Sequence, residues 1–215
     1  MITTESSPPA EPAAAPAGSR RVVIADDEPG ARTALAEMLA EEGFDVVGQA
    51  GDGEQVVAMA QALRPDLIII DVELGKTDGI EAAGEIAGEK IAPVVMISDV
   101  AHRDLVTRAR DAGALAYLCK PLSRSSLLPA VEVAVARYAE TTALRAQIAD
   151  ATNRLETRKV LDRAKGLLMT HRRMTEPEAF RWIQRTAMDR RVTAVSVAAA
   201  VVDQYVGQSV RRVAS

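Results

Sequence analysis

The chain has 215 residues, of which 48% are hydrophobic and 26% charged, a composition typical of a soluble globular protein. This length allows one large domain, or one medium domain and one small domain. The single cysteine, Cys119, excludes an intramolecular disulfide and any cysteine-cluster metal site, and its place in an apolar run predicts a buried strand residue.

Charge is distributed unevenly along the chain. Residues 150–215 carry a net charge of +6, whereas residues 1–149 carry −10. An acidic first part joined to a basic last part predicts two domains with different partners. The basic end is compatible with nucleic acid, although a solvated charged helix face explains the same charge.

Residues 1–19 are rich in Pro, Ala and Ser and contain no apolar segment after a basic start. This pattern predicts a disordered tail and argues against a secretory signal. No apolar run in the sequence approaches the roughly 18 residues needed to span a bilayer. We therefore expect a cytoplasmic protein with no membrane interaction.

Residues 20–138 alternate short apolar runs with amphipathic segments. The runs suit strands that are buried on both faces of a parallel sheet. They are VVIA at 22–25, VVG at 46–48, LIII at 67–70, VVMI at 94–97 and AYL at 116–118. The helical segments between them end at Glu42-Gly43, before Pro65 and at Gly113. Five such units predict a doubly wound α/β domain.

Polar residues follow four of the predicted strands. Asp26 and Asp27 end the first strand, Asp71 the third, Ser98 the fourth and Lys120 the fifth. Each residue alone reads as an ordinary cap, loop or surface residue. Together they lie at the carboxyl ends of parallel strands, where such sheets bind ligands. Clustered carboxylates favour Mg²⁺, and a lysine and a hydroxyl beside them suit a phosphoryl group.

The segments VVIADDEPGAR, LIIIDVELGKTDGI, VVMIS and GALAYLCKP resemble the receiver domains of bacterial response regulators, over roughly residues 21–138. The resemblance implies a flavodoxin-like (βα)₅ fold and a sensor histidine kinase as partner. It implies phosphorylation of Asp71, with Mg²⁺ held by Asp26, Asp27, Asp71 and the backbone carbonyl of Glu73. It also implies that Ser98 and Lys120 grip the phosphoryl group and that Tyr117 is the switch aromatic.

Two positions depart from the receiver pattern. Gly75 stands where receiver domains usually have proline, which predicts a more mobile loop after Asp71. Asp99 follows Ser98, where a small residue is usual. Its carboxylate would either repel the phosphoryl group or point to solvent, so these departures bear on the rate and lifetime of phosphorylation.

A helical pattern continues after Pro121, with Ser123 as its expected N-cap. Residues 139–156 form a linker in which Leu144, Ile148, Ala151 and Leu155 have the 4-3-4 spacing of a coiled-coil seam. Two heptads are fewer than a convincing coiled coil requires. One amphipathic helix that packs on its own domain explains the spacing equally well.

The last part, residues 157–206, reads as a small bundle of three helices. The long helix supplies the first, and Thr175 with Glu178 forms a capping box that starts the second. The third starts near Thr193, and a flexible tail is expected over 207–215. Phe180 is expected in the core of the bundle.

The segment ETRKVLDRAKGLLMTHRRMTEPEAFRWIQRTAMDRR resembles the ANTAR domain, the RNA-binding output module of transcription-antitermination regulators. The matching features are Ala164-Lys165-Gly166, Met169, Glu178-Ala179-Phe180 and Ala187-Met188. The resemblance implies binding to RNA hairpins near terminators and homodimers formed on phosphorylation.

Basic residues of this part suit RNA phosphates. The candidates are Arg163, Lys165, Arg172, Arg173, Arg181, Arg185, Arg190 and Arg191. Trp182 is either a platform on which a base stacks or, as its helical spacing favours, a core or half-buried residue.

Three functions remain open at this point. The first is phosphorylation-controlled antitermination by a protein that is not an enzyme beyond slow self-dephosphorylation. The second is a signalling relay whose helical part binds a protein. The third is an aspartyl-phosphate hydrolase, for which Glu73 would be needed as a second acid but matches a backbone ligand. DNA ranks below RNA because the output segment lacks a helix-turn-helix pattern.

Overall fold

The computed structural model describes residues 19–75 and 77–213, and side chains within 19–75 and 78–205. The predicted tail at 1–19 therefore lies almost wholly outside the described residues. The chain divides after Thr141 into two units, which we call the sheet unit and the helical unit.

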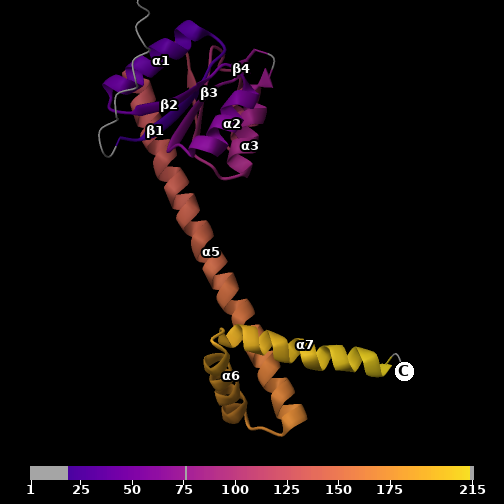
Figure 1. Cartoon of the computed structure of the whole chain (residues 1–215). Helices are drawn as coiled ribbons and strands as arrows, with labels where there is room; N and C mark the ends of the chain where they lie inside the picture. The colour runs from indigo at the N-terminus through magenta and orange to yellow at the C-terminus, as the bar shows by residue number, and fades with distance from the viewer. Residues whose placement is uncertain (1–18, 76, 214–215) are drawn as a thin grey trace, which may run out of the picture. The chain divides into compact units, whose positions relative to one another are not determined.

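The sheet unit contains a five-stranded parallel sheet in the order β2-β1-β3-β6-β7 (Figure 1). The strands are β1 (Arg21–Ala25), β2 (Asp45–Ala50), β3 (Leu67–Asp71), β6 (Val94–Ser98) and β7 (Ala116–Cys119). Every residue of β3 and β6 is buried because helices cover both faces of the sheet, which explains their continuous apolar runs. The predicted doubly wound fold is confirmed.

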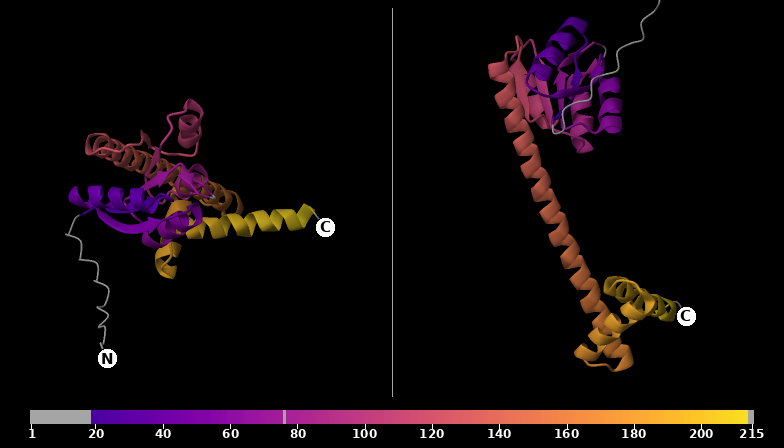
Figure 2. Two further views of the ribbon diagram at one scale, coloured as in Figure 1. Left: turned by 90° about the horizontal axis from the view of Figure 1, so that it is seen from above. Right: turned by 60° about the vertical axis from the view of Figure 1, so that its left-hand side comes forward.

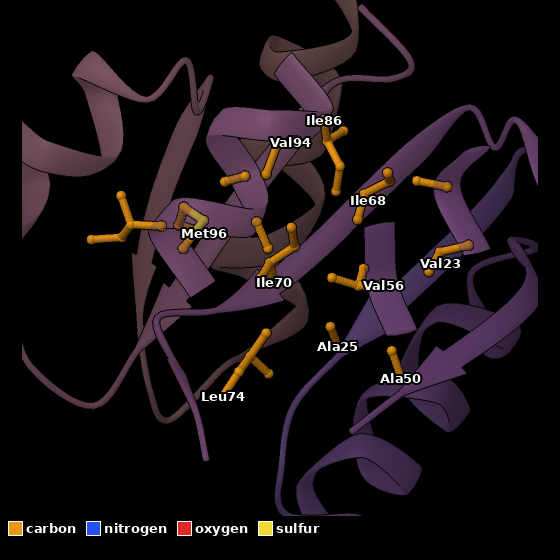
Figure 3. Packing of buried hydrophobic residues seen from close by; sticks show 14 of the residues in the cluster. Val23, Ala25, Ala50, Val56, Ile68, Ile70, Leu74, Ile86, Val94 and Met96 are labelled. Carbon is orange, nitrogen blue, oxygen red and sulfur yellow. The ribbon is translucent and has the colours of Figure 1, made fainter. Parts of the chain in front are cut away.

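Two apolar layers hold the helices on the sheet. One layer packs α2 (Gly53–Leu63), α3 (Gly79–Gly88) and α4 (Arg103–Asp111) on one face through residues such as Val56 and Ile86 (Figure 3). The other layer packs α1 (Pro29–Glu41) and the start of α5 (Arg124–Arg172) on the opposite face. The predicted helix ends are confirmed, since Gly43 and Gly113 have positive φ and Arg64 caps α2 before Pro65.

A short antiparallel hairpin after Asp71 was not predicted. It pairs β4 (Glu73–Leu74) with β5 (Thr77–Asp78). Gly75 lies in its turn with a φ of +59°. Proline is confined to a φ near −65°, so this turn could not form with the proline usual in receiver domains.

The helical unit is built from the second part of α5 with α6 (Glu176–Arg190) and α7 (Ala194–Val213) (Figure 2). Small and branched side chains of the three helices form its core: Ala164, Leu168, Ala179, Ile183, Ala187, Val197, Ala198 and Val201. The predicted capping box is present, because the Glu178 carboxylate accepts a hydrogen bond from the Thr175 N–H at 2.8 Å. The helix α7 extends to Val213, beyond the expected domain end at residue 206.

Two burial predictions were wrong. Phe180 is 40% exposed, because Ala179, Ile183 and Ala187 form the buried stripe of α6 and Phe180 lies at its edge. Cys119 is exposed, because it is the last residue of β7, an edge strand of the sheet.

The α5 helix is continuous from Arg124 to Arg172 and includes Pro129. Ser123 accepts a hydrogen bond from the Ser126 N–H at 3.2 Å, as expected of an N-cap. The seam residues Leu144, Ile148 and Leu155 are 52%, 66% and 60% exposed. Among the helices described here, none is long and apolar enough to cross a membrane.

Candidate functional site: a strand-end acidic pocket and a basic helical surface

The carboxyl ends of β1, β3 and β6 bring three polar side chains into the sheet unit. Asp26, Asp71 and Ser98 are only 1%, 3% and 1% exposed, although their neighbours in the sheet are apolar. Burial of polar groups requires partners, because an unsatisfied buried polar group costs free energy. The partners of these three residues therefore define the site.

Lys120 links two of the buried carboxylates. Its Nζ forms ion pairs with Asp71 Oδ2 and, at 2.8 Å, with Asp26 Oδ2. The Lys120 N–H donates to the Ser98 carbonyl at 2.8 Å, which fixes the lysine at the end of β7. Two of the carboxylates expected at this edge thus share one ammonium group.

The ionisation of this pocket follows from burial and pairing. Burial raises the pKa of Asp71, although hydrogen bonds from Lys120 and from the Glu73 N–H, at 3.1 Å, act against the rise. Burial alone would lower the pKa of Lys120, but its bonds to Asp26 and Asp71 raise it above the ordinary value. The ammonium group therefore stays charged at neutral pH.

Asp27 lies apart from the buried pair. Its side chain is exposed and lines a hollow together with Glu73, Gly75 and Arg108. Within the described ranges, no three His, Cys, Asp or Glu side chains are arranged to hold a metal ion. The donor chemistry nevertheless fits Mg²⁺, since Asp27 and Glu73 line this hollow and the buried carboxylates belong to Asp26 and Asp71, the chain neighbours of its lining residues Asp27 and Val72.

Ser98 and Tyr117 both contact Val100, which lies two residues after the end of β6. The Val100 N–H donates to Ser98 Oγ at 3.1 Å. The Tyr117 hydroxyl donates to the Val100 carbonyl at 2.8 Å. One residue of the β6–α4 loop is therefore held by the hydroxyl at the pocket and by the aromatic residue of β7.

Asp99, which departs from the receiver pattern, is exposed. Its neighbour Ser98 is buried. The Asp99 side chain is therefore accessible to solvent.

Gly79 is a residue of the site that the sequence interpretation missed. A Cβ atom at this position would lie 1.9 Å from the Asp71 carbonyl oxygen, so any larger residue would displace the backbone of Asp71. The Gly79 N–H also donates to the Val72 carbonyl at 3.0 Å. The start of α3 is thereby packed against the end of β3, and the sequence signal for it is the glycine after Asp78.

Three of the eight basic candidates in the helical unit have partners. Lys165 forms ion pairs with Asp162 at 2.8 Å and Glu176 at 2.7 Å, and so ties α5 to α6. Arg172 donates to the Tyr205 hydroxyl at 3.2 Å, and Arg181 donates to a backbone carbonyl of its own helix.

The other five candidates are exposed and make no ion pair within the described part of the chain. These are Arg163, Arg173, Arg185, Arg190 and Arg191. Exposed guanidinium groups without a carboxylate partner are the groups best suited to meet phosphate. The basic surface of the helical unit therefore rests mainly on these arginines.

Trp182 is half-buried and packs against the helical core. The Arg172 guanidinium carbon lies 4.8 Å from the centre of its ring system, within the range of a cation–π contact. The His171 ring stacks on Tyr205 with centroids 4.5 Å apart. The favoured prediction, a core or half-buried tryptophan, is confirmed, and the ring also contacts a surface arginine.

This combination of a five-stranded parallel sheet and an acidic strand-end pocket defines a response regulator receiver domain, whose family model matches residues 22–132. The ANTAR domain model matches residues 149–202, within the helical unit. The chain belongs to the response regulators that join a receiver domain to an ANTAR domain.

The chain is similar along most of its length to the transcriptional regulatory protein PdtaR of Mycobacterium tuberculosis. It is 56% identical over 184 residues, which cover 86% of this chain and 90% of the relative. A protein-glutamate methylesterase/protein-glutamine glutaminase of Myxococcus xanthus is 43% identical over 109 residues, covering 49% of this chain and 31% of that protein. Similarity to the methylesterase is thus confined to the receiver portion.

Solved structures resemble the sheet unit. One chain of the CheX–CheY–BeF₃–Mg²⁺ complex from Borrelia burgdorferi is 30% identical with a TM-score of 0.50, over 52% of this chain and 86% of that one. The signal receiver domain of a modulated diguanylate cyclase from Desulfovibrio desulfuricans is also 30% identical. Its TM-score is 0.53, over 57% of this chain and 98% of that chain.

Proposed function

We propose that this chain is phosphorylated on Asp71 by a sensor histidine kinase and that phosphorylation controls binding of RNA hairpins, and hence transcription termination. The observation that carries the first part is a buried carboxylate at a strand end, held by Lys120 and by the Glu73 N–H. The observation that carries the second is a set of exposed, unpaired arginines on a unit that matches the ANTAR domain. The donor domain of a sensor histidine kinase and nascent RNA both lie in the cytoplasm, so the chain would act there.

In this proposal the Asp71 carboxylate attacks the phosphorus of a phosphohistidine, and the bond between phosphorus and the imidazole nitrogen breaks. Lys120 already contacts Asp71, so its ammonium is close enough to neutralise a phosphoryl oxygen after transfer. Asp26, Asp27, Asp71 and the Glu73 carbonyl would hold Mg²⁺, which supplies charge neutralisation. The chain acts as an acceptor, and no general base is assigned for rapid hydrolysis.

Through Ser98 and Tyr117, phosphorylation of Asp71 would change the conformation of the β6–α4 loop. Ser98 Oγ now accepts a hydrogen bond from the Val100 N–H, and a phosphoryl group on Asp71 would offer a charged acceptor for the Ser98 hydroxyl proton. If the serine turns towards that group, the Val100 loop is released and the Tyr117 hydroxyl loses its position. A difference of a few kcal/mol between the two loop states is sufficient to shift their populations.

The exposed seam of α5 supports a homodimer in the active state. Leu144, Ile148 and Leu155 would be covered by the same residues of a second chain, as in a coiled coil. Pairing would place two helical units near each other and double the arginine surface offered to one RNA. Paired sites bind more tightly through effective concentration, without any new type of contact.

The test is a salt titration of binding to an RNA with two hairpins, with and without beryllofluoride and Mg²⁺. Wild-type binding should weaken as salt rises and strengthen with beryllofluoride. The Asp71→Ala variant should bind weakly and show no response to beryllofluoride. If RNA binding is absent even at low salt, the helical unit serves a protein partner, as in the relay that the sequence left open.

A further inference from the structure

The hollow beside the acidic pocket has a volume of about 490 Å³, a size at which protein pockets hold small molecules. Three carboxylates line it, those of Asp27, Glu73 and Asp78. Arg108 of α4 carries the only positive charge among the described residues of its lining. The carboxylates repel an anion that enters the hollow, so Arg108 is the side chain of this lining that can attract it.

Arg108 is held by an ion pair that it can leave. Its Nη2 pairs with Asp78 Oδ2, and the two side chains are 52% and 29% exposed. The other carboxylate oxygen, Asp78 Oδ1, accepts a hydrogen bond from the Ile80 N–H at 2.9 Å and so caps α3. Asp78 therefore keeps a partner when the guanidinium departs, and a partly exposed ion pair contributes little to stability.

The backbone of α4 is held independently of this ion pair. Ala109 is buried and Leu105 packs against the same apolar layer, so α4 stays on the sheet without the charge of the arginine. The guanidinium can thus exchange one anionic partner for another while the helix stays in place. Its planar fork of N–H groups matches phosphate as well as carboxylate.

We propose that Arg108 binds the phosphoryl group of a small acyl phosphate in this hollow and brings the donor to Asp71. The hollow adjoins the phosphorylation site, since it is also lined by Val72, the chain neighbour of Asp71. Transfer forms a bond between an Asp71 oxygen and phosphorus and breaks the bond from phosphorus to the acyl oxygen, which leaves as a carboxylate. This inference rests on the proposed phosphorylation of Asp71 and adds a residue that selects the donor by its charge.

The first experiment measures the second-order rate constant for phosphorylation by acetyl phosphate, on the full-length chain with Mg²⁺ and by intact-mass spectrometry. Arg108→Gln should lower it by about 5- to 50-fold, the range of losing one charge-assisted hydrogen bond at a half-exposed site. Arg110→Gln is the matched control and should react as the wild type does. Arg110 also lies on α4, but it pairs with Asp111 at 2.8 Å and is not among the described residues that line the hollow.

A second donor separates charge from structure. At neutral pH acetyl phosphate carries two negative charges, whereas phosphoramidate carries one. Arg108→Gln should therefore lower the rate with acetyl phosphate more than the rate with phosphoramidate, and added salt should narrow the difference. If Arg108 acted only by holding α4 in place, both rates would fall by the same factor. Arg108→Lys keeps the charge and should recover part of the lost rate.

Binding is measured without transfer by acetonylphosphonate, in which a methylene group replaces the bridging oxygen of acetyl phosphate. Its dissociation constant, from titration of the ³¹P resonance, should rise for Arg108→Gln by a factor similar to the loss in rate. It should stay at the wild-type value for Arg110→Gln. Circular dichroism during urea titration shows whether each variant folds.

Asp78→Asn should give a change of opposite sign. Asparagine still caps α3 but no longer holds the guanidinium, so phosphorylation by acetyl phosphate should be faster by roughly 1.5- to 5-fold. Loss of a carboxylate also reduces repulsion of the donor, and the double variant Arg108→Gln/Asp78→Asn separates the two causes. A gain that comes from the freed arginine should be absent when Arg108 is already replaced.

Three results would overturn the inference. The first is a wild-type rate and wild-type affinity of Arg108→Gln, and the second is an equal loss in Arg110→Gln, which would mean that only net charge matters. The third is an equal loss with acetyl phosphate and phosphoramidate, which would leave Arg108 a structural role alone. Failure of the proposed function gives a different result, in which the wild type gains no phosphoryl group on Asp71 from any donor.

Discussion

Buried groups form the candidate site of the sheet unit, whereas exposed groups form that of the helical unit. Asp26 and Asp71 are almost fully enclosed, and a lysine links them. Arg185 and Arg190 of the helical unit are exposed and make no ion pair within the residues described. A reaction at one atom needs fixed geometry and low dielectric, while recognition of a large polyanion needs accessible charge. The two kinds of site follow from these two demands.

Gly79 of the sheet unit lies in a packed environment, whereas Gly166 of the helical unit lies in an open one. A Cβ at Gly79 in the sheet unit would collide with the backbone of Asp71, so packing alone demands glycine there. At Gly166 in the helical unit, a Cβ would meet nothing within 4 Å. Glycine inside a helix costs about 1 kcal/mol relative to alanine, and the fold offers no reason for that cost at Gly166.

The largest expected effect is on phosphorylation. Asp71→Asn should abolish phosphoryl transfer from a histidine kinase or from acetyl phosphate, because the amide lacks the attacking carboxylate. Asp111→Asn, which removes an exposed carboxylate of the same unit, should be phosphorylated as the wild type is. Intact-mass spectrometry measures the added phosphoryl group, and its presence on Asp71→Asn would move the acceptor to another residue.

The next effect concerns the small core of the helical unit. Leu168 is fully buried, so Leu168→Ala should destabilise this unit by about 2–5 kcal/mol. Leu155→Ala on the same helix should change the stability by less than about 0.5 kcal/mol in dilute unphosphorylated protein, since Leu155 is 60% exposed. Urea titration followed by Trp182 fluorescence distinguishes the two, because this tryptophan packs on the helical core.

The fold and the acidic pocket were predictable for one physical reason. A parallel sheet buried on both faces requires continuous apolar runs, and those runs place the residues after them at one edge. Asp71 and Lys120 are 49 residues apart, yet the order β3-β6-β7 brings their side chains into contact. Sequence position and strand order together determine this kind of site.

Exposure was harder to predict than position. Phe180 follows Ala179 in an apolar pattern, and only the narrow stripe of Ala179, Ile183 and Ala187 leaves its ring at the edge of the core. The β4–β5 hairpin depends on a positive φ at Gly75, which no hydrophobic pattern indicates. Lys165 looked like a phosphate contact by charge alone, but its two carboxylate partners lie on both α5 and α6.

Gly79→Ala tests whether packing around Asp71 positions the carboxylate. The added methyl must displace the Asp71 carbonyl, so we expect a loss of roughly 1–3 kcal/mol in the free energy of unfolding of the sheet unit, and slower phosphorylation. Gly88 ends the same helix with open space around it, so Gly88→Ala should keep the wild-type stability or raise it by up to about 1 kcal/mol. Equal behaviour of the two variants in urea titration and phosphorylation would remove the positioning role from Gly79.

The smallest expected change in stability is at Gly166, and it is a gain where the changes at Leu168 and Gly79 are losses. Because alanine meets no obstacle there and favours the helix, Gly166→Ala should stabilise the helical unit by about 0.5–1 kcal/mol, measured by urea titration with Trp182 fluorescence. If RNA approaches the α5 backbone at this open position, the same variant should also bind the two-hairpin RNA more weakly. A more stable protein with lower RNA affinity would show that glycine is kept there for contact, as Gly79 is kept for packing. Unchanged RNA affinity would mean that the contrast between the two glycines lies in folding alone.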